Sequence, residues 1–196
     1  MSDKKVLILD YGAGNVASLK FALERLGVEV VISDHEEAIA KSEYLFIPGV
    51  GAAGQAMQKI REKGLVDIIK AYEKPVLGIC LGMQLMCAFS EEDQVNTLNI
   101  FPDQVERFSK SPKIPHLGWN QIEFQSHSLF DKIPQKSHFY FVHSFKVTKS
   151  EFNIANCNYG AKFVAVMNRD NFYGCQFHPE KSHLVGQQFL TNFLKL

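Results

Sequence analysis

The sequence lacks an excess of charge of either sign. Its 21 Lys and Arg residues balance 21 Asp and Glu residues, so the formal net charge at pH 7 is zero. Proteins that bind nucleic acid or an anionic membrane through their charge need a basic surface. The composition therefore gives no electrostatic reason to expect either partner.

Long apolar runs and a secretory leader are also absent. No stretch approaches the roughly 18 apolar residues that would indicate a transmembrane helix. The first apolar run is short and ends at Asp10, without the small-residue cleavage site that follows a signal peptide. We therefore expect a cytoplasmic protein.

Cysteine pairs with metal-binding spacing are missing as well. The four cysteines form no CxxC pair, and the histidines show no paired zinc spacing. We therefore expect no metal site and treat the cysteines as reduced thiols, one of which is a candidate nucleophile. They are Cys80, Cys87, Cys157 and Cys175.

The 196 residues, of which 46% are hydrophobic, are enough for one sizeable domain, which we expect to span residues 1–196. The first half alternates short apolar runs with amphipathic stretches, which predicts a parallel sheet covered by helices on both faces. Asp34 is placed to cap the second helix. The predicted strands are 6–10, 28–32, 44–47 and 76–79, and the predicted helices are 16–26, 36–40, 52–63 and 81–89.

The second half is richer in aromatic residues and short β-like runs, which predict antiparallel strands added to the parallel core. The last segment, 182–196, has the apolar spacing of a helix. The whole pattern predicts an α/β fold with a mostly parallel central sheet flanked by helices. The additional strands are predicted in 104–108, 121–124, 138–147, 163–167 and 172–177.

The strongest local signal is a buried strand that runs directly into a helix, with Cys80 at the junction between Gly78 and Gly82. Small neighbours permit a tight, strained turn that exposes the thiol. The helix N-terminus favours a thiolate, and the N–H of Leu81 points to where an oxyanion would form. A core cysteine in a strand–helix contact is the alternative, and this segment alone leaves both interpretations open.

A glycine-rich loop, residues 48–54, follows the third predicted strand. Carboxyl ends of parallel strands converge on the edge of the sheet where ligands bind. Val50 and Gly51 are thus candidates for the second oxyanion donor. Taken alone, the loop is as well explained by an ordinary β-to-α turn.

The segment 177–183 contains His178 and Glu180 with Pro179 between them. Proline disfavours helix at the preceding residue, and alternate residues of an extended chain face the same way. The carboxylate can then accept from one ring nitrogen, leaving the other for Cys80. A surface turn is the alternative. The remaining histidines are interpreted as packed or solvated: His35, His116, His127, His138, His143 and His183.

A competing motif follows the first strand. Residues 12–17 fit G-x-G-x-x-A, with Asp34 about 20 residues further on, as in NAD-binding oxidoreductases. This hypothesis leaves Cys80 and the His178–Glu180 pair without a role.

Taken together, these segments resemble the class I, triad-type glutamine amidotransferases over nearly the whole chain. The resemblance is closest to the glutaminase subunits of imidazole glycerol phosphate synthases, which act in histidine biosynthesis. It is carried by DYGAGN (10–15), PGVGAAGQAM (48–57), GICLGMQLM (78–86), PHLGWN (115–120), YFVHSF (140–145) and FHPEKS (177–182).

The resemblance implies a glutaminase that releases ammonia from glutamine, with Cys80 as nucleophile, His178 as acid and base, and Glu180 as its orienter. It implies a flavodoxin-like fold, a heterodimer with a cyclase subunit that is a (β/α)8 barrel, and neither a metal nor an organic cofactor. The glutamine site would contain Gly49, Gly51, Gln84, Ser144 and Phe145. The cyclase interface would contain Asn15, Trp119, Tyr140 and Lys181.

Three positions depart from the family pattern without touching the triad. TLNIFPDQV (97–105) replaces a glycine-rich stretch, Ala53 replaces an aromatic residue, and Phe145 replaces a tyrosine. A related glutaminase that serves a paralogous barrel in surface-polysaccharide synthesis therefore stays an alternative.

Overall fold

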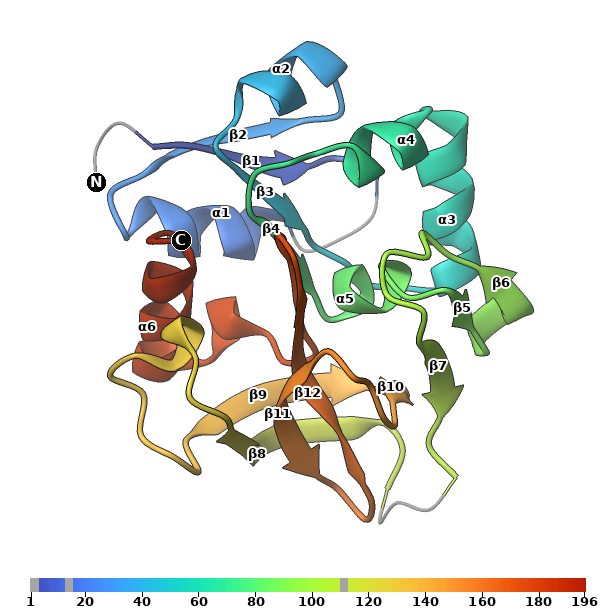
Figure 1. Cartoon of the computed structure of the whole chain (residues 1–196), viewed down its shortest axis with the longest axis vertical. Helices are drawn as coiled ribbons and strands as arrows, with labels where there is room; N and C mark the ends of the chain where they lie inside the picture. Colours follow the sequence, from blue (N-terminus) through green and yellow to red (C-terminus); the bar gives the residue numbers. More distant parts are fainter. Residues whose placement is uncertain (1–3, 13–15, 110–112) are drawn as a thin grey trace.

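The computed structural model describes residues 4–12, 16–109 and 113–196 and contains a nine-stranded sheet in the order β2-β1-β3-β4-β13-β12-β11-β8-β9 (Figure 1). Five strands run parallel: β1 (Lys5–Leu9), β2 (Glu29–Ser33), β3 (Tyr44–Ile47), β4 (Val76–Ile79) and β13 (Phe172–Cys175). The other four are antiparallel to their neighbours: β8 (His116–Phe124), β9 (His138–His143), β11 (Asn153–Asn158) and β12 (Lys162–Arg169). The predicted α/β class, with antiparallel strands added by the second half, is confirmed.

A smaller sheet lies beside the main one in the order β10-β7-β5-β6. Its strands are short: β5 (Phe89–Ser90), β6 (Val95–Asn96), β7 (Gln104–Arg107) and β10 (Phe145–Val147). Three 3-10 turns complete the second half: η1 (Glu92–Gln94), η2 (Ser128–Phe130) and η3 (Pro179–Lys181). This sheet brings η1 and the start of β10 toward the carboxyl end of β4.

Helices cover both faces of the parallel strands. In Figure 1, α1 (Val16–Glu24) and α6 (His183–Phe193) lie on one side, and α3 (Ala53–Glu62), α4 (Leu65–Lys70) and α5 (Leu81–Leu85) lie on the other. The alternation of side chains along a strand explains this arrangement. Val6 and Ile8 of β1 enter the core with Leu19, whereas Leu7 and Leu9 enter the core that contains Met57. The remaining helix, α2 (Glu36–Lys41), contributes Ile39 to the second core.

The helix after Cys80 is shorter than predicted. It was expected to reach Phe89 but ends at Leu85, and Phe89 belongs to β5. The carbonyls of Met86 and Cys87 accept N–H groups from residues 99–101, so pairing with this later loop replaces further helical turns.

The predicted cap of α2 is wrong. The residue at the cap is His35, and its side chain makes no capping bond. The Asp34 carboxylate instead accepts from Lys63 Nζ at 2.5 Å. The Asp34 carboxylate, which local sequence assigned to the helix cap, therefore forms a tertiary ion pair with Lys63 instead. None of the helices among the described residues has the length and apolarity needed to cross a bilayer.

Candidate active site

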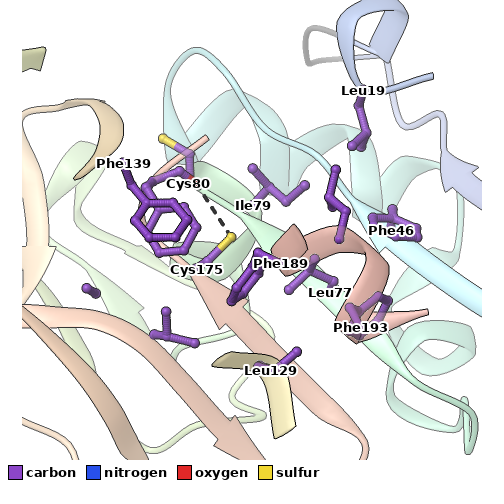
Figure 2. Close-up of a cluster of buried hydrophobic side chains, with 14 of the residues drawn as sticks. Leu19, Phe46, Leu77, Ile79, Cys80, Leu129, Phe139, Cys175, Phe189 and Phe193 are labelled. Atoms are coloured by element: carbon purple, nitrogen blue, oxygen red, sulfur yellow. Dashed lines mark hydrogen bonds between the residues drawn. The ribbon is translucent and has the colours of Figure 1, made fainter. Parts of the chain in front are cut away.

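The turn between β4 and α5 holds Cys80 in a backbone conformation that residues with a β-carbon rarely adopt. Its φ is 53° and its ψ is −109°. The N–H of Cys80 donates to the Cys175 carbonyl of β13 at 2.8 Å. Figure 2 shows the two cysteines close together beside the buried hydrophobic cluster. The Cys80 carbonyl accepts from the N–H of Gln84 at 3.2 Å. Bonds to both neighbouring elements thus hold the turn that the strand-to-helix pattern predicted.

Glycines allow the glycine-rich loop to touch this turn directly. A β-carbon on Gly82 would lie 1.8 Å from the carbonyl oxygen of Ile47, and one on Gly49 would lie 2.7 Å from the backbone nitrogen of Gly82. Real β-carbons do not approach backbone atoms so closely. The backbones of the loop and the turn therefore meet, which brings Val50 and Gly51 next to Leu81.

The predicted contact between His178 and Glu180 is present. His178 Nδ1 lies 2.8 Å from Glu180 Oε1, and the two side chains are only 3% and 4% exposed. His178 is extended as expected, while Glu180 lies in the 3-10 turn η3. Strand β9 fixes the segment, because the Tyr140 carbonyl accepts the N–H of His178 at 2.9 Å. The Ser182 hydroxyl accepts the N–H of Tyr140 and donates to the carbonyl of His178.

Charge around His178 favours its protonated form. Burial lowers the pKa of its ring, but the Cys80 sulfur as a thiolate and the Glu180 carboxylate raise it more, to about 10. The Nε2 atom is buried and has no hydrogen-bond partner among the described side chains. An imidazolium next to a thiolate is the resting state of a nucleophile–base pair.

Cys80 and His178 line one cavity of about 330 Å³. A volume in this range suits a small-molecule site. Most of the residues predicted to bind glutamine or stabilise the oxyanion line the same cavity, although they come from distant parts of the chain. They are Val50, Gly51, Leu81, Gln84, Ser144 and Phe145.

Gln84 is held so that only its oxygen remains for a ligand. Its Nε2 donates to the Phe145 carbonyl and to Gln176 Oε1, each at 2.9 Å. A primary amide nitrogen has two protons, and these two bonds use both. A ligand in the cavity would therefore meet Gln84 as a hydrogen-bond acceptor.

The cavity also contains side chains that the sequence did not single out. Glu92 of η1 lines it, and its carboxylate accepts the N–H of Ala53 at 3.0 Å. Burial is the largest cause that raises the pKa of Glu92. The bond from Ala53 lowers this pKa, and the negative charge of Asp93 raises it further. Only the acidic run around Glu92 could have drawn attention to it, and that run is also typical of a solvated turn.

His143 is packed, in agreement with its interpretation from the sequence, and it also forms part of the cavity wall. Its Nδ1 lies 2.7 Å from the Phe145 carbonyl, and its Nε2 lies 3.0 Å from His116 Nδ1. Burial lowers the pKa of His143 to about 3 and that of His116 to about 4, so both rings are neutral. The hydrogen bonds of this neutral pair hold in place the part of the cavity wall that contains Ser144 and Phe145.

Three of the four residues predicted at a partner interface lie together near η3. The rings of Trp119 and Tyr140 are 5.9 Å apart, and Lys181 Nζ lies 6.0 Å from the Tyr140 ring. Trp119 and the neighbouring Leu117 are 45% and 59% exposed, which is typical of a contact surface. The fourth residue, Asn15, lies outside the described residues.

The structure weighs against the alternative hypothesis of a dinucleotide site, because the carboxylate that this site needs already has a partner. Asp34 would have to meet a ribose, but it is paired with Lys63. Lys59 Nζ donates to the Gly12 carbonyl at 2.5 Å, within the glycine-rich motif itself. Residues 13–15 of that motif lie outside the described residues.

Comparisons with known proteins identify the family and the fold. The family model described as glutamine amidotransferase class-I matches residues 7–196. A crystal structure described as a glutamine amidotransferase has the same fold, with a TM-score of 0.75, 20% identity, and coverage of 97% of both chains. PurLQS from Thermotoga maritima is similar, with a TM-score of 0.75, 16% identity, and coverage of 98% of both chains. The fold and the family model thus define a class I glutamine amidotransferase.

The sequence relatives are more specific. The chain is 43% identical to the imidazole glycerol phosphate synthase subunit HisH of Shewanella sediminis, over 100% of this chain and 92% of the relative. It is 45% identical to HisH of Bacteroides fragilis over 98% and 100%, and 42% identical to HisH of Vibrio parahaemolyticus over the full length of both. The chain therefore belongs to the class I glutamine amidotransferases and, within them, to the HisH subunits.

Proposed function

We propose that the chain is a single glutamine amidotransferase domain, residues 1–196, that hydrolyses glutamine to glutamate and ammonia through Cys80, His178 and Glu180. One observation carries the proposal: a strained cysteine, a charged histidine and the glycine-rich loop line the same small cavity. The family match and the HisH relatives support it.

In the first step, the Cys80 thiolate attacks the carboxamide carbon of glutamine. The oxyanion is held by N–H groups of Leu81 and of the Val50–Gly51 loop, each worth about 3 kcal/mol in the transition state. His178 then protonates the departing ammonia, leaving a γ-glutamyl thioester on Cys80. Glu180 accepts from Nδ1 and holds the ring so that Nε2 faces the sulfur.

In the second step, His178 takes a proton from water as the water attacks the thioester. Collapse of the tetrahedral intermediate releases glutamate and regenerates the thiolate and the imidazolium. Four groups in the cavity suit the amino-acid end of glutamine. Glu92 and Gln84 Oε1 offer acceptors for its α-ammonium group, while the N–H of Gly51 and the hydroxyl of Ser144 offer donors for its carboxylate.

The ammonia would be used by a partner, a (β/α)8 barrel cyclase that makes imidazole glycerol phosphate in histidine biosynthesis. The relatives are named as subunits of that synthase, which supports a heterodimer. The exposed surface around Trp119, Tyr140 and Lys181 is the proposed docking site. Together these assignments favour a cytoplasmic enzyme and the histidine pathway over the surface-polysaccharide alternative.

The test is glutamate release from glutamine by this chain mixed with the histidine-pathway cyclase barrel of its own source and that barrel's nucleotide substrate. We expect strong release by the wild type, loss in Cys80→Ala, and retention in Cys87→Ala, since Cys87 is a fully buried core thiol. Turnover retained by Cys80→Ala would remove Cys80 from the mechanism. Failure of that barrel to stimulate release would move the chain to a paralogous pathway.

A further inference from the structure

The sulfur of Cys80 lies between groups with opposite preferences for its charge. The Val142 carbonyl, 3.6 Å away, can accept from the thiol but repels a thiolate. The Nε2 of Gln176, 3.7 Å away, can donate to the sulfur and so favours the thiolate. Gln176 directly precedes Phe177 and His178, its side chain is completely buried, and the triad gives it no role.

The orientation of the Gln176 amide follows from its neighbours. The Phe145 carbonyl can only accept, so the atom of Gln84 that faces it must be the NH2 group. The same NH2 group faces Gln176, so Gln176 presents its oxygen to Gln84. The NH2 group of Gln176 must therefore face the Cys80 sulfur.

The anchor of this chain of amides is itself fixed. The Phe145 carbonyl also accepts from His143 Nδ1, and His143 Nε2 accepts from His116 Nδ1. Each bond in this chain pairs one donor with one acceptor, and the two amides, the carbonyl and the two imidazoles are neutral. Since flipping either amide would place like atoms against each other, the network has one low-energy arrangement.

We propose that Gln176 is a positioning residue that holds the Cys80 thiolate by an N–H···S hydrogen bond, with its own amide locked by Gln84 and the Phe145 carbonyl. The inference deepens the proposed glutaminase function and rests on it for its catalytic meaning. His178 must give up its proton to the leaving ammonia. A donor that does not titrate keeps the sulfur oriented throughout the cycle.

The experiment is the pH dependence of Cys80 alkylation by iodoacetamide, followed by mass spectrometry of the Cys80 peptide. The variants are Gln176→Leu, which removes the donor, and Gln176→Glu, which still accepts from Gln84 but turns an oxygen toward the sulfur. Loss of one hydrogen bond to a charged group shifts a pKa by about one unit. We expect the alkylation midpoint to rise by about one pH unit in Gln176→Leu, with about tenfold slower alkylation below the midpoint. In Gln176→Glu we expect a rise at least as large, because the carboxylate also repels the thiolate.

Asn192→Leu is the matched control. Asn192 is also a buried amide that donates to two carbonyls, those of Leu129 and Asp131, but it lies in α6 and outside the cavity. We expect it to lower the unfolding midpoint without moving the alkylation profile. A folded Gln176 variant with the wild-type profile would overturn the inference.

Steady-state kinetics give an independent reading. In Gln176→Glu we expect kcat for glutamate release to fall about tenfold while KM stays within about twofold, because Gln84 keeps its bond to position 176. A purely structural role would leave both the alkylation profile and kcat of the folded variant unchanged. Iodoacetamide does not involve glutamine. A wild type that alkylates normally but releases no glutamate would therefore refute the proposed function and not this inference.

Discussion

Removing the β-carbon of residue 80 should relieve strain that the active-site turn imposes. The φ of 53° and ψ of −109° at Cys80 are accessible to glycine but unfavourable for any residue with a side chain. Such a conformation costs about 1–3 kcal/mol and persists only where the surrounding structure enforces it. Here the backbone hydrogen bonds that Cys80 makes with Cys175 and Gln84 enforce this conformation. The comparison of Cys80→Gly with Cys80→Ala isolates the β-carbon, because both variants lack the sulfur.

In an ordinary strand, alanine is more stable than glycine by about 0.5–1 kcal/mol, because the glycine chain loses more freedom on folding. Cys157 in β11 is a matched position, since it is a buried cysteine with an ordinary negative φ. We expect Cys157→Gly to be less stable than Cys157→Ala by about that amount. At position 80 glycine also relieves about 1–3 kcal/mol of backbone strain, which offsets this penalty. We therefore expect Cys80→Gly to be at least as stable as Cys80→Ala.

Urea denaturation of the four variants measures these differences directly, and thermal unfolding gives a second readout. For a domain of this size, each kcal/mol corresponds to about 2–4 °C in Tm. Equal penalties for replacing alanine by glycine at positions 80 and 157 would refute the claim that the turn is strained. Glutamate release should be lost in both position-80 variants and kept in both position-157 variants.

Two further predictions follow from the same geometry. Gly82→Ala places a β-carbon against the Ile47 carbonyl and should displace the turn by about 1 Å, lowering glutamate release about 100-fold. The control Gly64→Ala meets no neighbouring atom within 4 Å and lies outside the cavity, so it should keep its activity even though its φ of 66° makes alanine cost some stability. A fully active Gly82→Ala enzyme would contradict this reasoning. The second concerns acid stability. His116 and His143 have folded pKa values of about 4 and 3, so between pH 6.5 and 4 the unfolded chain binds more protons. Stability therefore falls as pH falls, by about 1.4 kcal/mol per pH unit for each histidine, and urea titrations of His116→Phe should show a shallower slope. An unchanged slope would contradict the depressed pKa of His116 in the folded chain.

Local sequence predicted the parts of the fold that depend on short-range pattern. The four strands of the first half lie within one residue of their predicted positions at both ends. Continuous apolar runs suit the buried strands β1, β3 and β4, and the β-branched run of the edge strand β2 favours an extended chain although it is largely exposed. The helix after Cys80 was drawn four residues too long, because its true end depends on pairing with residues 99–101. Asp34 failed as a cap for the same kind of reason, since Lys63 lies close only in the folded chain.

For the candidate site, too, some features follow from the sequence and others only from the tertiary structure. The sequence alone determined which residues are chemically competent: a cysteine between glycines at a strand end, a glycine-rich loop, and a histidine two residues before a glutamate. Their meeting depends on the parallel pairing of β13 with β4, which sets the segment after Cys175 beside Cys80. Only the tertiary structure disclosed Gln176, His143 and Glu92, because an amide, a neutral imidazole and a capping carboxylate acquire a role only from the atoms that face them. Those atoms include the Cys80 sulfur, the His116 ring and the Ala53 N–H, which lie tens of residues away along the chain, and no local periodicity encodes such distances.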